Sequence, residues 1–281
     1  MNAKSKTIDT TYLSVEQAET RGFIHRDYIA HCLRWSHVIK RLGQNKTYAK
    51  TRLLDVGCGR ELPLPTTLYS SRFILKAYYG VDYGPINDVA VARFHSGKFP
   101  MDCFEKTDVC DITLADLDSE PVNHVTCFEM AEHVEPRHLL RALRHVRSLM
   151  SVNGIAWFST PCWDRVACAA NHVNEMTYEA FGAVLQSCGF AIDAVHGTFA
   201  SQRDYKHLVE ADPKLAEMYR RLSDYYDSNY LSTVFAPMFP AQSRNCLWEV
   251  RNGTNPKIKW KTLPECEAPW GSSIKWEEMH E

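Results

Sequence analysis

The chain has 281 residues, a formal net charge of −2 at pH 7 and a hydrophobic fraction of 45%. This length suits one large domain with appended segments, and the near-neutral charge gives no overall signature of nucleic-acid binding. No apolar run approaches membrane-spanning length, residues 1–11 are polar, and the cysteines include no CxxC pair. We therefore expect a cytoplasmic protein without a membrane segment or a cysteine-based zinc site.

Residues 1–50 are predicted to form a helical N-terminal segment. Ser14 and Gln17 are typical of a capping box. Gly22 separates a first helix from a second one, which ends near Gly43. In the second helix apolar side chains recur at helical spacing, at Ile24, Tyr28, Cys32, Trp35 and Ile39.

A glycine-rich turn follows the first predicted strand, residues 52–56. Gly57 and Gly59 can adopt positive φ angles or let a ligand approach the backbone. The next predicted strand, residues 80–83, ends at the acidic Asp82. A glycine turn after one strand and an acid after the next is the arrangement with which an open parallel sheet binds the ribose of an adenosine.

Strands and helices alternate through the rest of residues 51–252, which predicts one α/β domain with a mostly parallel sheet. A helix that begins at Pro136 is expected to be capped by Asn153 and Gly154. Residues 201–245 read as a helical insertion that covers the substrate site, and residues 253–281 as an irregular tail. The remaining predicted segments are helices at 66–77, 87–95 and 177–188, a loop at 99–104, and strands at 123–129, 155–159, 190–195 and 245–251.

The segment Asp55-Val56-Gly57-Cys58-Gly59 resembles the glycine motif of the class I, Rossmann-like S-adenosylmethionine-dependent methyltransferases. A dinucleotide fingerprint would have a third glycine where this chain has Glu61, and that carboxylate would repel a pyrophosphate. S-adenosylmethionine has no phosphate and carries a sulfonium. The resemblance therefore implies this cofactor and a seven-stranded sheet with helices on both faces.

The same resemblance implies a role for each acid of the motif. Asp55, Gly57 and Gly59 would frame the methionine part of the cofactor, and Asp82 would bind the ribose hydroxyls. Residues 105–111 resemble the third strand end of the family, where Asp108 and Val109 would bind the adenine.

A second cluster, Glu129, Glu132 and His133, reads as ExxEH after the fourth predicted strand. In a helical turn these positions share one face, and His172 follows the neighbouring fifth strand. Two carboxylates and two imidazoles are suitable ligands for magnesium, manganese, iron or zinc. In the alternative, metal-free interpretation, Glu129 lines the cofactor site and His133, next to Glu132, acts as a general base.

ExxEH is similar to segments of the ubiquinone-biosynthesis O-methyltransferases and of the small-RNA 2′-O-methyltransferases, which hold a divalent metal there. This resemblance implies that the metal lowers the pKa of an acceptor hydroxyl and aims it at the methyl group. We expect O-methylation of a small-molecule or sugar-like acceptor. Two alternatives are a nucleic-acid methyltransferase that uses Arg137, Arg141 and Arg144, and a non-catalytic cofactor-binding subunit.

Overall fold

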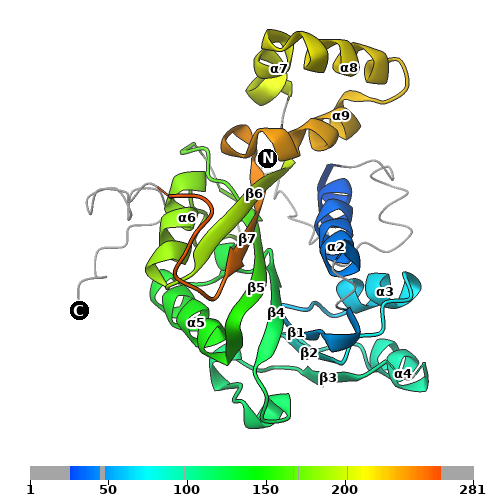
Figure 1. Ribbon diagram of the computed structural model, residues 1–281, viewed down its shortest axis with the longest axis vertical. Helices are drawn as coiled ribbons and strands as arrows, with labels where there is room; N and C mark the ends of the chain where they lie inside the picture. Colours follow the sequence, from blue (N-terminus) through cyan, green and yellow to red (C-terminus); the bar gives the residue numbers. More distant parts are fainter. Residues whose placement is uncertain are drawn as a thin grey trace, which may run out of the picture.

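The computed structural model describes residues 26–44, 48–97, 99–166, 168–169, 171–200 and 202–260. Its centre is a seven-stranded sheet with the order β3-β2-β1-β4-β5-β7-β6 (Figure 1). β1 to β5 pair in parallel, and β7 runs antiparallel to both β5 and β6. The predicted α/β fold with a mostly parallel sheet is thus confirmed. The strands are β1 (Arg52–Val56), β2 (Ala77–Val81), β3 (Met101–Phe104), β4 (Val122–Phe128), β5 (Met150–Pro161), β6 (Ala191–Phe199) and β7 (Asn245–Arg251).

Helices cover both faces of this sheet (Figure 1). One face carries α2 (Arg26–Gln44), α3 (Pro63–Ser70) and α4 (Asp88–Ser96), and the other carries α5 (Pro136–Leu149) and α6 (Tyr178–Ser187). Each face has its own apolar core. Trp157 of β5 packs in the core under α2 to α4, and Trp248 of the neighbouring β7 packs in the core under α5 and α6. The sheet is therefore the middle of three layers.

The helix α2 is attached to the sheet by a buried ionic contact as well as by apolar packing. Arg41 donates from Nε and Nη2 to the two carboxylate oxygens of Glu249 on β7, at 2.8 and 2.6 Å. His37 and the Trp157 indole also contact this carboxylate. Burial alone would raise the pKa of Glu249, but these hydrogen bonds outweigh it and hold the pKa at about 2.

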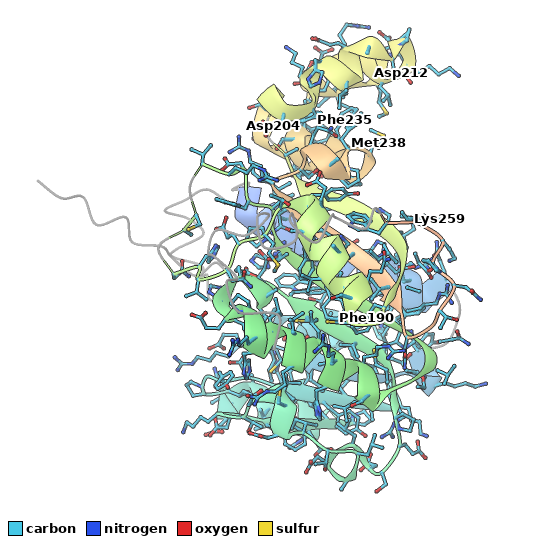
Figure 2. The ribbon with its side chains drawn as sticks, turned by 90° about the vertical axis from the view of Figure 1, so that its left-hand side faces the viewer. Phe190, Asp204, Asp212, Phe235, Met238 and Lys259 are labelled. Atoms are coloured by element: carbon cyan, nitrogen blue, oxygen red, sulfur yellow. The ribbon has the colours of Figure 1, made fainter. Side chains whose placement is uncertain are left out.

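The predicted helical insertion contains three helices, α7 (Gln202–Ala211), α8 (Pro213–Ser223) and α9 (Ser228–Phe235). They share a small apolar core formed by Tyr205, Val209, Leu231 and Phe235. Figure 2 shows Asp212 at the far end of the insertion, with Phe235 and Met238 nearer the sheet. α9 contacts α2 and β6, so the insertion projects beyond the sheet and is joined to it at one end.

Short 3-10 helices complete the connections between these elements. They are η2 (Tyr48–Lys50), η3 (Val109–Asp111), η4 (Ala115–Leu117), η5 (Ala131–His133), η6 (Ala236–Met238) and η7 (Pro240–Gln242). Within the part of the chain that the structure describes, no helix is both long and apolar enough to cross a membrane.

Three local predictions were wrong. The helix predicted at 66–77 is α3, which begins at Pro63 because a first helical turn tolerates proline, and it ends at Ser70. The loop predicted at 99–104 contains β3, a short edge strand stabilised by pairing with β2. Asn153 and Gly154 do not cap α5, since the chain passes directly from α5 into β5 and both residues lie inside that strand.

The two ends of the chain test the sequence predictions only in part. The first predicted helix, at residues 14–22, lies outside the described residues, as does the tail beyond residue 260. Residues 253–260 are irregular, as expected, and Trp260 packs on α6 and donates to the Glu179 carbonyl at 2.9 Å. A Cβ atom at Gly182 would lie 2.0 Å from the Trp260 ring, so this contact requires glycine.

Candidate functional site

The glycine turn after β1 has the backbone that its sequence predicts. Gly57 and Gly59 have φ angles of 71° and 73°, a conformation that glycine adopts at little cost. The Asp82 carboxylate, just past β2, accepts hydrogen bonds from Gly59 N at 2.8 Å and Gly84 N at 2.7 Å. Asp82 thereby joins the turn after β1 to the end of β2.

Asp55 lies below this turn, in the interior. Its carboxyl group accepts hydrogen bonds from the Tyr78 hydroxyl on β2 and the Thr126 hydroxyl on β4, each at 2.7 Å. Burial raises the pKa of Asp55 to about 6, against the opposing effect of these two hydrogen bonds. The structure therefore places Asp55 where it connects three strands, away from the exposed side of the turn.

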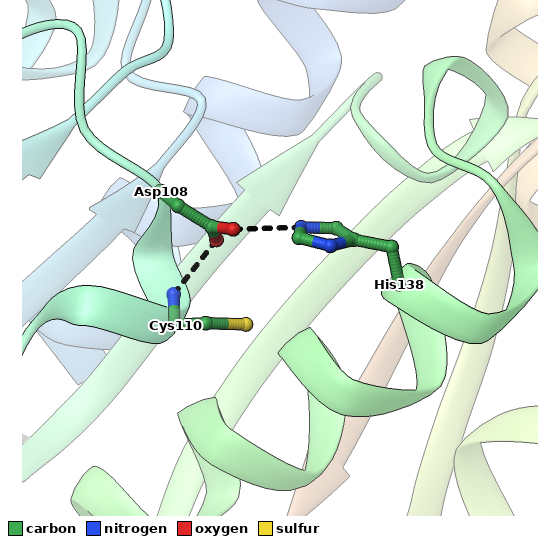
Figure 3. A group of neighbouring side chains, drawn as sticks. All are labelled: Asp108, Cys110 and His138. Atoms are coloured by element: carbon green, nitrogen blue, oxygen red, sulfur yellow. Dashed lines mark hydrogen bonds and ion pairs between the residues drawn. The ribbon is translucent and has the colours of Figure 1, made fainter.

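Asp108 caps η3, and Val109 is buried directly behind it. The carboxylate accepts from Cys110 N at 2.8 Å and lies 3.1 Å from His138 Nε2 (Figure 3). Burial would raise the pKa of Asp108, but the Cys110 N–H, the Tyr83 hydroxyl and His138 lower it on balance. Thr107 N donates to the Asp82 carbonyl at 3.1 Å. The predicted ribose and adenine acids thus lie on adjacent segments at one edge of the sheet.

Asp108, Cys110 and His138 also have potential metal-ligand atoms within 4.8 Å of one another (Figure 3). However, Arg141 Nη2 lies 3.1 Å from the same Asp108 oxygen that faces His138. A guanidinium at this distance would repel a bound cation. We therefore do not assign a metal to this group.

Glu129 departs from the predicted helical face. Its φ angle is 54°, in the left-handed region, and η5 begins only at Ala131. Its side chain turns toward β5 and β7, where it accepts from Ser159 Oγ at 2.8 Å and Asn245 Nδ2 at 2.8 Å. Arg34 Nη1 of α2 lies 3.4 Å away. The prediction that Glu129 shares a face with Glu132 and His133 was wrong, because these contacts with distant segments decide its conformation.

Glu132, His133 and His172 do come together, with potential ligand atoms within 4.8 Å of one another. The loop that carries His172 is hydrogen-bonded to η5, because Val173 N and Asn174 N donate to the Glu132 carbonyl at 2.8 and 3.0 Å. The two imidazole rings meet edge to face, with centroids 4.8 Å apart. The predicted proximity of His172 to the ExxEH segment is thus present in the structure.

The partners of the two histidines indicate the tautomer of each ring. His133 Nδ1 lies 3.0 Å from the Asn171 carbonyl, which can only accept, so Nδ1 carries the hydrogen. His172 Nδ1 contacts the carboxylate of the buried Glu175. Each ring is therefore assigned a hydrogen on Nδ1 and a free lone pair on Nε2, the form that binds metals or accepts protons.

Glu132 completes the cluster with a buried carboxyl group, whose side chain is 1% exposed beside the 40% exposed His133. Burial and the nearby Glu129 raise the pKa of Glu132 well above its usual value, although the Thr160 hydroxyl donates to it. Such a group is stabilised as an anion only beside a positive charge. One carboxyl and two imidazole nitrogens form a donor set that suits a divalent metal, and without a metal they suit proton transfer.

Sequence reasoning missed several residues that shape the site. Glu175 is not among them, because the sequence gives it a signal: it stands three positions after His172 on the same loop. Arg34, Asn245 and Thr160 had none, since they reach the site from segments far away in the sequence.

Comparisons with known proteins bear on the family and the fold of the chain. A family model described as a methyltransferase domain matches residues 25–211. The fold is similar to Burkholderia thailandensis 1,6-didemethyltoxoflavin-N1-methyltransferase with bound 1,6-didemethyltoxoflavin and S-adenosylhomocysteine, with a TM-score of 0.52, 13% identity, and coverage of 83% of this chain and 82% of that one. It is also similar to the magnesium protoporphyrin IX methyltransferase of Synechocystis PCC 6803 with bound S-adenosylmethionine, with a TM-score of 0.50, 13% identity, and coverage of 89% and 99%.

No protein in the curated set matches the chain. The structural similarities, at 13% identity, establish the fold. The family model spans well over half of the residues, from the second half of the N-terminal segment into the insertion. The chain belongs to the methyltransferase domain family.

Proposed function

We propose that this methyltransferase uses S-adenosylmethionine and methylates an oxygen of a small-molecule or sugar-like acceptor. The cofactor half of this proposal is supported by the positive φ angles of Gly57 and Gly59 and by the position of Asp82 beside them. It is also supported by the two similar structures, which were solved with S-adenosylmethionine or S-adenosylhomocysteine bound.

Within the cofactor site, the backbone at Gly57 and Gly59 would lie against the methionine part. Each Asp82 oxygen accepts one backbone hydrogen bond, at 2.8 and 2.7 Å, and a carboxylate oxygen has a second lone pair for a ribose hydroxyl. Asp108 and Val109 would contact the adenine. Asp55 supports the turn from below, through Tyr78 and Thr126.

The observation that carries the reaction centre is the convergence of Glu132, His133 and His172, whose potential ligand atoms lie within 4.8 Å of one another, with His133 Nε2 3.9 Å from the Glu132 carboxylate. In His133 and His172 alike, Nδ1 is held by an acceptor of the chain itself, which fixes the ring orientation. Without a metal, His133 Nε2, on the more exposed ring, would take the proton of the acceptor hydroxyl. The oxygen–carbon bond then forms as the sulfur–carbon bond breaks, and S-adenosylhomocysteine leaves.

The same three groups fit a divalent metal, since they offer one carboxylate and two imidazoles with carboxylate or carbonyl partners behind the rings. When bound, the metal would lower the pKa of an acceptor hydroxyl. Glu129 is left out of this donor set, because its carboxylate is engaged by Ser159, Asn245 and Arg34.

The arginines of α5 favour a small acceptor over a nucleic acid. Arg141 pairs with Asp108, with Nη2 3.1 Å from the carboxylate. One of the cations predicted to contact phosphates is thus already paired with a carboxylate of the chain itself, which reduces the positive charge that this helix offers to a nucleic acid.

The test is methyl transfer from labelled S-adenosylmethionine to metabolite and nucleic-acid pools, with and without EDTA. We expect label in the small-molecule fraction, loss of turnover with EDTA and recovery after addition of a divalent metal. Label in the nucleic-acid fraction alone would contradict the acceptor class. Unchanged turnover in EDTA would contradict the metal and leave His133 as a metal-free general base.

A further inference from the structure

Arg34 is an arginine in the middle of α2 whose side chain is 1% exposed. It is held from three sides. Nη1 donates to Asn245 Oδ1 at 3.1 Å and lies 3.4 Å from Glu129 Oε1. Nη2 lies 2.6 Å from His31 Nδ1. Burial and the Arg34 charge lower the pKa of His31, so its neutral ring can accept this hydrogen bond.

This arrangement is costly for the folded protein. Among the described residues, Arg34 Nε is buried and has no hydrogen-bond partner. A buried ion pair offsets its desolvation only when geometry and hydrogen bonding are complete, and an unsatisfied buried donor destabilises further. Apolar side chains of α2 such as Val38 and Leu42 already attach the helix to the sheet. A role in function would explain why so costly a group lies at this position.

The partner of Arg34 is well placed for such a role. Glu129 directly follows β4, and β4 pairs with β1, the strand that leads into the glycine turn. Its neighbour Met130 borders that turn, since a Cβ atom on Gly57 would lie 3.5 Å from the Met130 Cβ. Glu129 thus lies at the same edge of the sheet as the glycine turn that would face the methionine half of the cofactor.

The carboxylate of Glu129 is also incompletely covered. Oε1 accepts from Ser159 and Asn245 and faces Arg34, whereas Oε2 accepts only from Asn245 within the described residues. The side chain is 21% exposed. Held by several donors in a left-handed backbone conformation, it presents a fixed negative charge with room for one more donor.

We propose that Arg34 is a positioning residue of the cofactor site, which holds the Glu129 carboxylate where it accepts the α-ammonium group of the methionine half of S-adenosylmethionine. The proposal rests on the proposed cofactor and extends it. The N-terminal helix, outside the glycine and acid motifs, thereby contributes to ligand affinity through a single buried side chain.

The test compares two ligands by calorimetric titration. S-adenosylhomocysteine carries the α-ammonium group, and 5′-methylthioadenosine lacks the amino-acid half but keeps the adenosine. We expect Arg34→Met to lower the affinity for S-adenosylhomocysteine about tenfold, as for loss of a charge-assisted hydrogen bond. The affinity for 5′-methylthioadenosine should fall less than about twofold. Glu129→Gln should show the same selective loss, and the double variant should lose no more than Glu129→Gln alone.

Arg41→Met is the matched control, because Arg41 also joins α2 to the sheet, through Glu249, but lies at no predicted ligand contact. It should lower the melting temperature and leave the ratio of the two affinities unchanged. Arg34→Lys keeps the charge and should fall between wild type and Arg34→Met. If Arg34→Met does not fold, the ratio of the two affinities in Glu129→Gln and Arg34→Lys tests the positioning role instead.

Equal losses for both ligands, or unchanged affinity for S-adenosylhomocysteine in the folded variants, would overturn the positioning role alone. Failure of the wild-type protein to bind either ligand would overturn the proposed cofactor, and the positioning role with it.

Discussion

The carboxyl edge of the sheet has two halves that are built differently. At the ends of β2 and β3, Asp82 and Asp108 each accept from a backbone N–H two residues on, that of Gly84 and that of Cys110. At the ends of β4 and β5, acids are held by side chains from distant segments, as when Glu129 is held by Asn245 and Arg34. The first half thus depends on local turns, and the second on the assembled fold.

The largest expected effect is a loss of turnover without a loss of cofactor affinity. His133→Ala should lower turnover by about 10²- to 10⁴-fold, as for loss of a general base or a metal ligand. Affinity for S-adenosylhomocysteine should stay within about twofold, because His133 belongs to the β4–β5 half. His207→Ala, on the exposed side of α7, is the control. Wild-type turnover in His133→Ala would contradict this division.

In the half formed by the ends of β1 to β3, Asp82→Ala should lower the affinity for S-adenosylhomocysteine about a hundredfold. The substitution removes both ribose acceptors and the hydrogen bond from Gly59 N. Turnover at saturating cofactor should change much less. Asp102→Ala, at an exposed acid of β3, is the matched control and should bind normally. Equal affinity in Asp82→Ala and wild type, by calorimetry, would place the ribose elsewhere.

The buried carboxyl of the cofactor half makes stability fall with increasing pH. The pKa of Asp55 is raised from 3.8 to about 6 in the folded state. Its neutral form is thus favoured by folding, and this contribution is lost as the pH rises from 4 through 6. Relative to Asp55→Asn, the wild-type free energy of unfolding should drop by about 2 kcal/mol over this range. Urea unfolding measures it, and a constant difference would contradict the burial argument.

The buried carboxylate of Glu249, which lies within β7 under α2, should behave in the opposite way. The pKa of Glu249 is lowered from 4.5 to about 2, so its stabilising effect is present above pH 4.5 and is lost as the pH falls toward 2. Because Arg41 is partly exposed, we expect an advantage over Glu249→Gln of about 1 kcal/mol at neutral pH. Thermal unfolding at pH 7 and pH 2 would show whether this advantage is lost, and its full persistence at pH 2 would contradict the pairing.

The difference between the halves also explains what the sequence could predict. The glycine turn and Asp82 were recognisable because residues adjacent in the sequence determine their conformation. β3 was missed because four residues with no continuous apolar run become a strand only by pairing with β2.

In the β4–β5 half, the proximity of His172 to Glu132 and His133 was predictable from the order of the strands. The orientation of Glu129 was not, since a positive φ angle is unusual for glutamate and depends here on Arg34 and Asn245. Nothing near Glu129 in the sequence indicates that these two residues reach it.

The most direct test of the account is calorimetric titration of the wild-type protein with S-adenosylhomocysteine. The account predicts saturable binding at one site per chain, which Asp82→Ala weakens strongly and His133→Ala leaves nearly unchanged. Absence of binding to the wild-type protein would contradict the proposal that the ends of β1 and β2, with η3, form a site for a sulfur-containing adenosine.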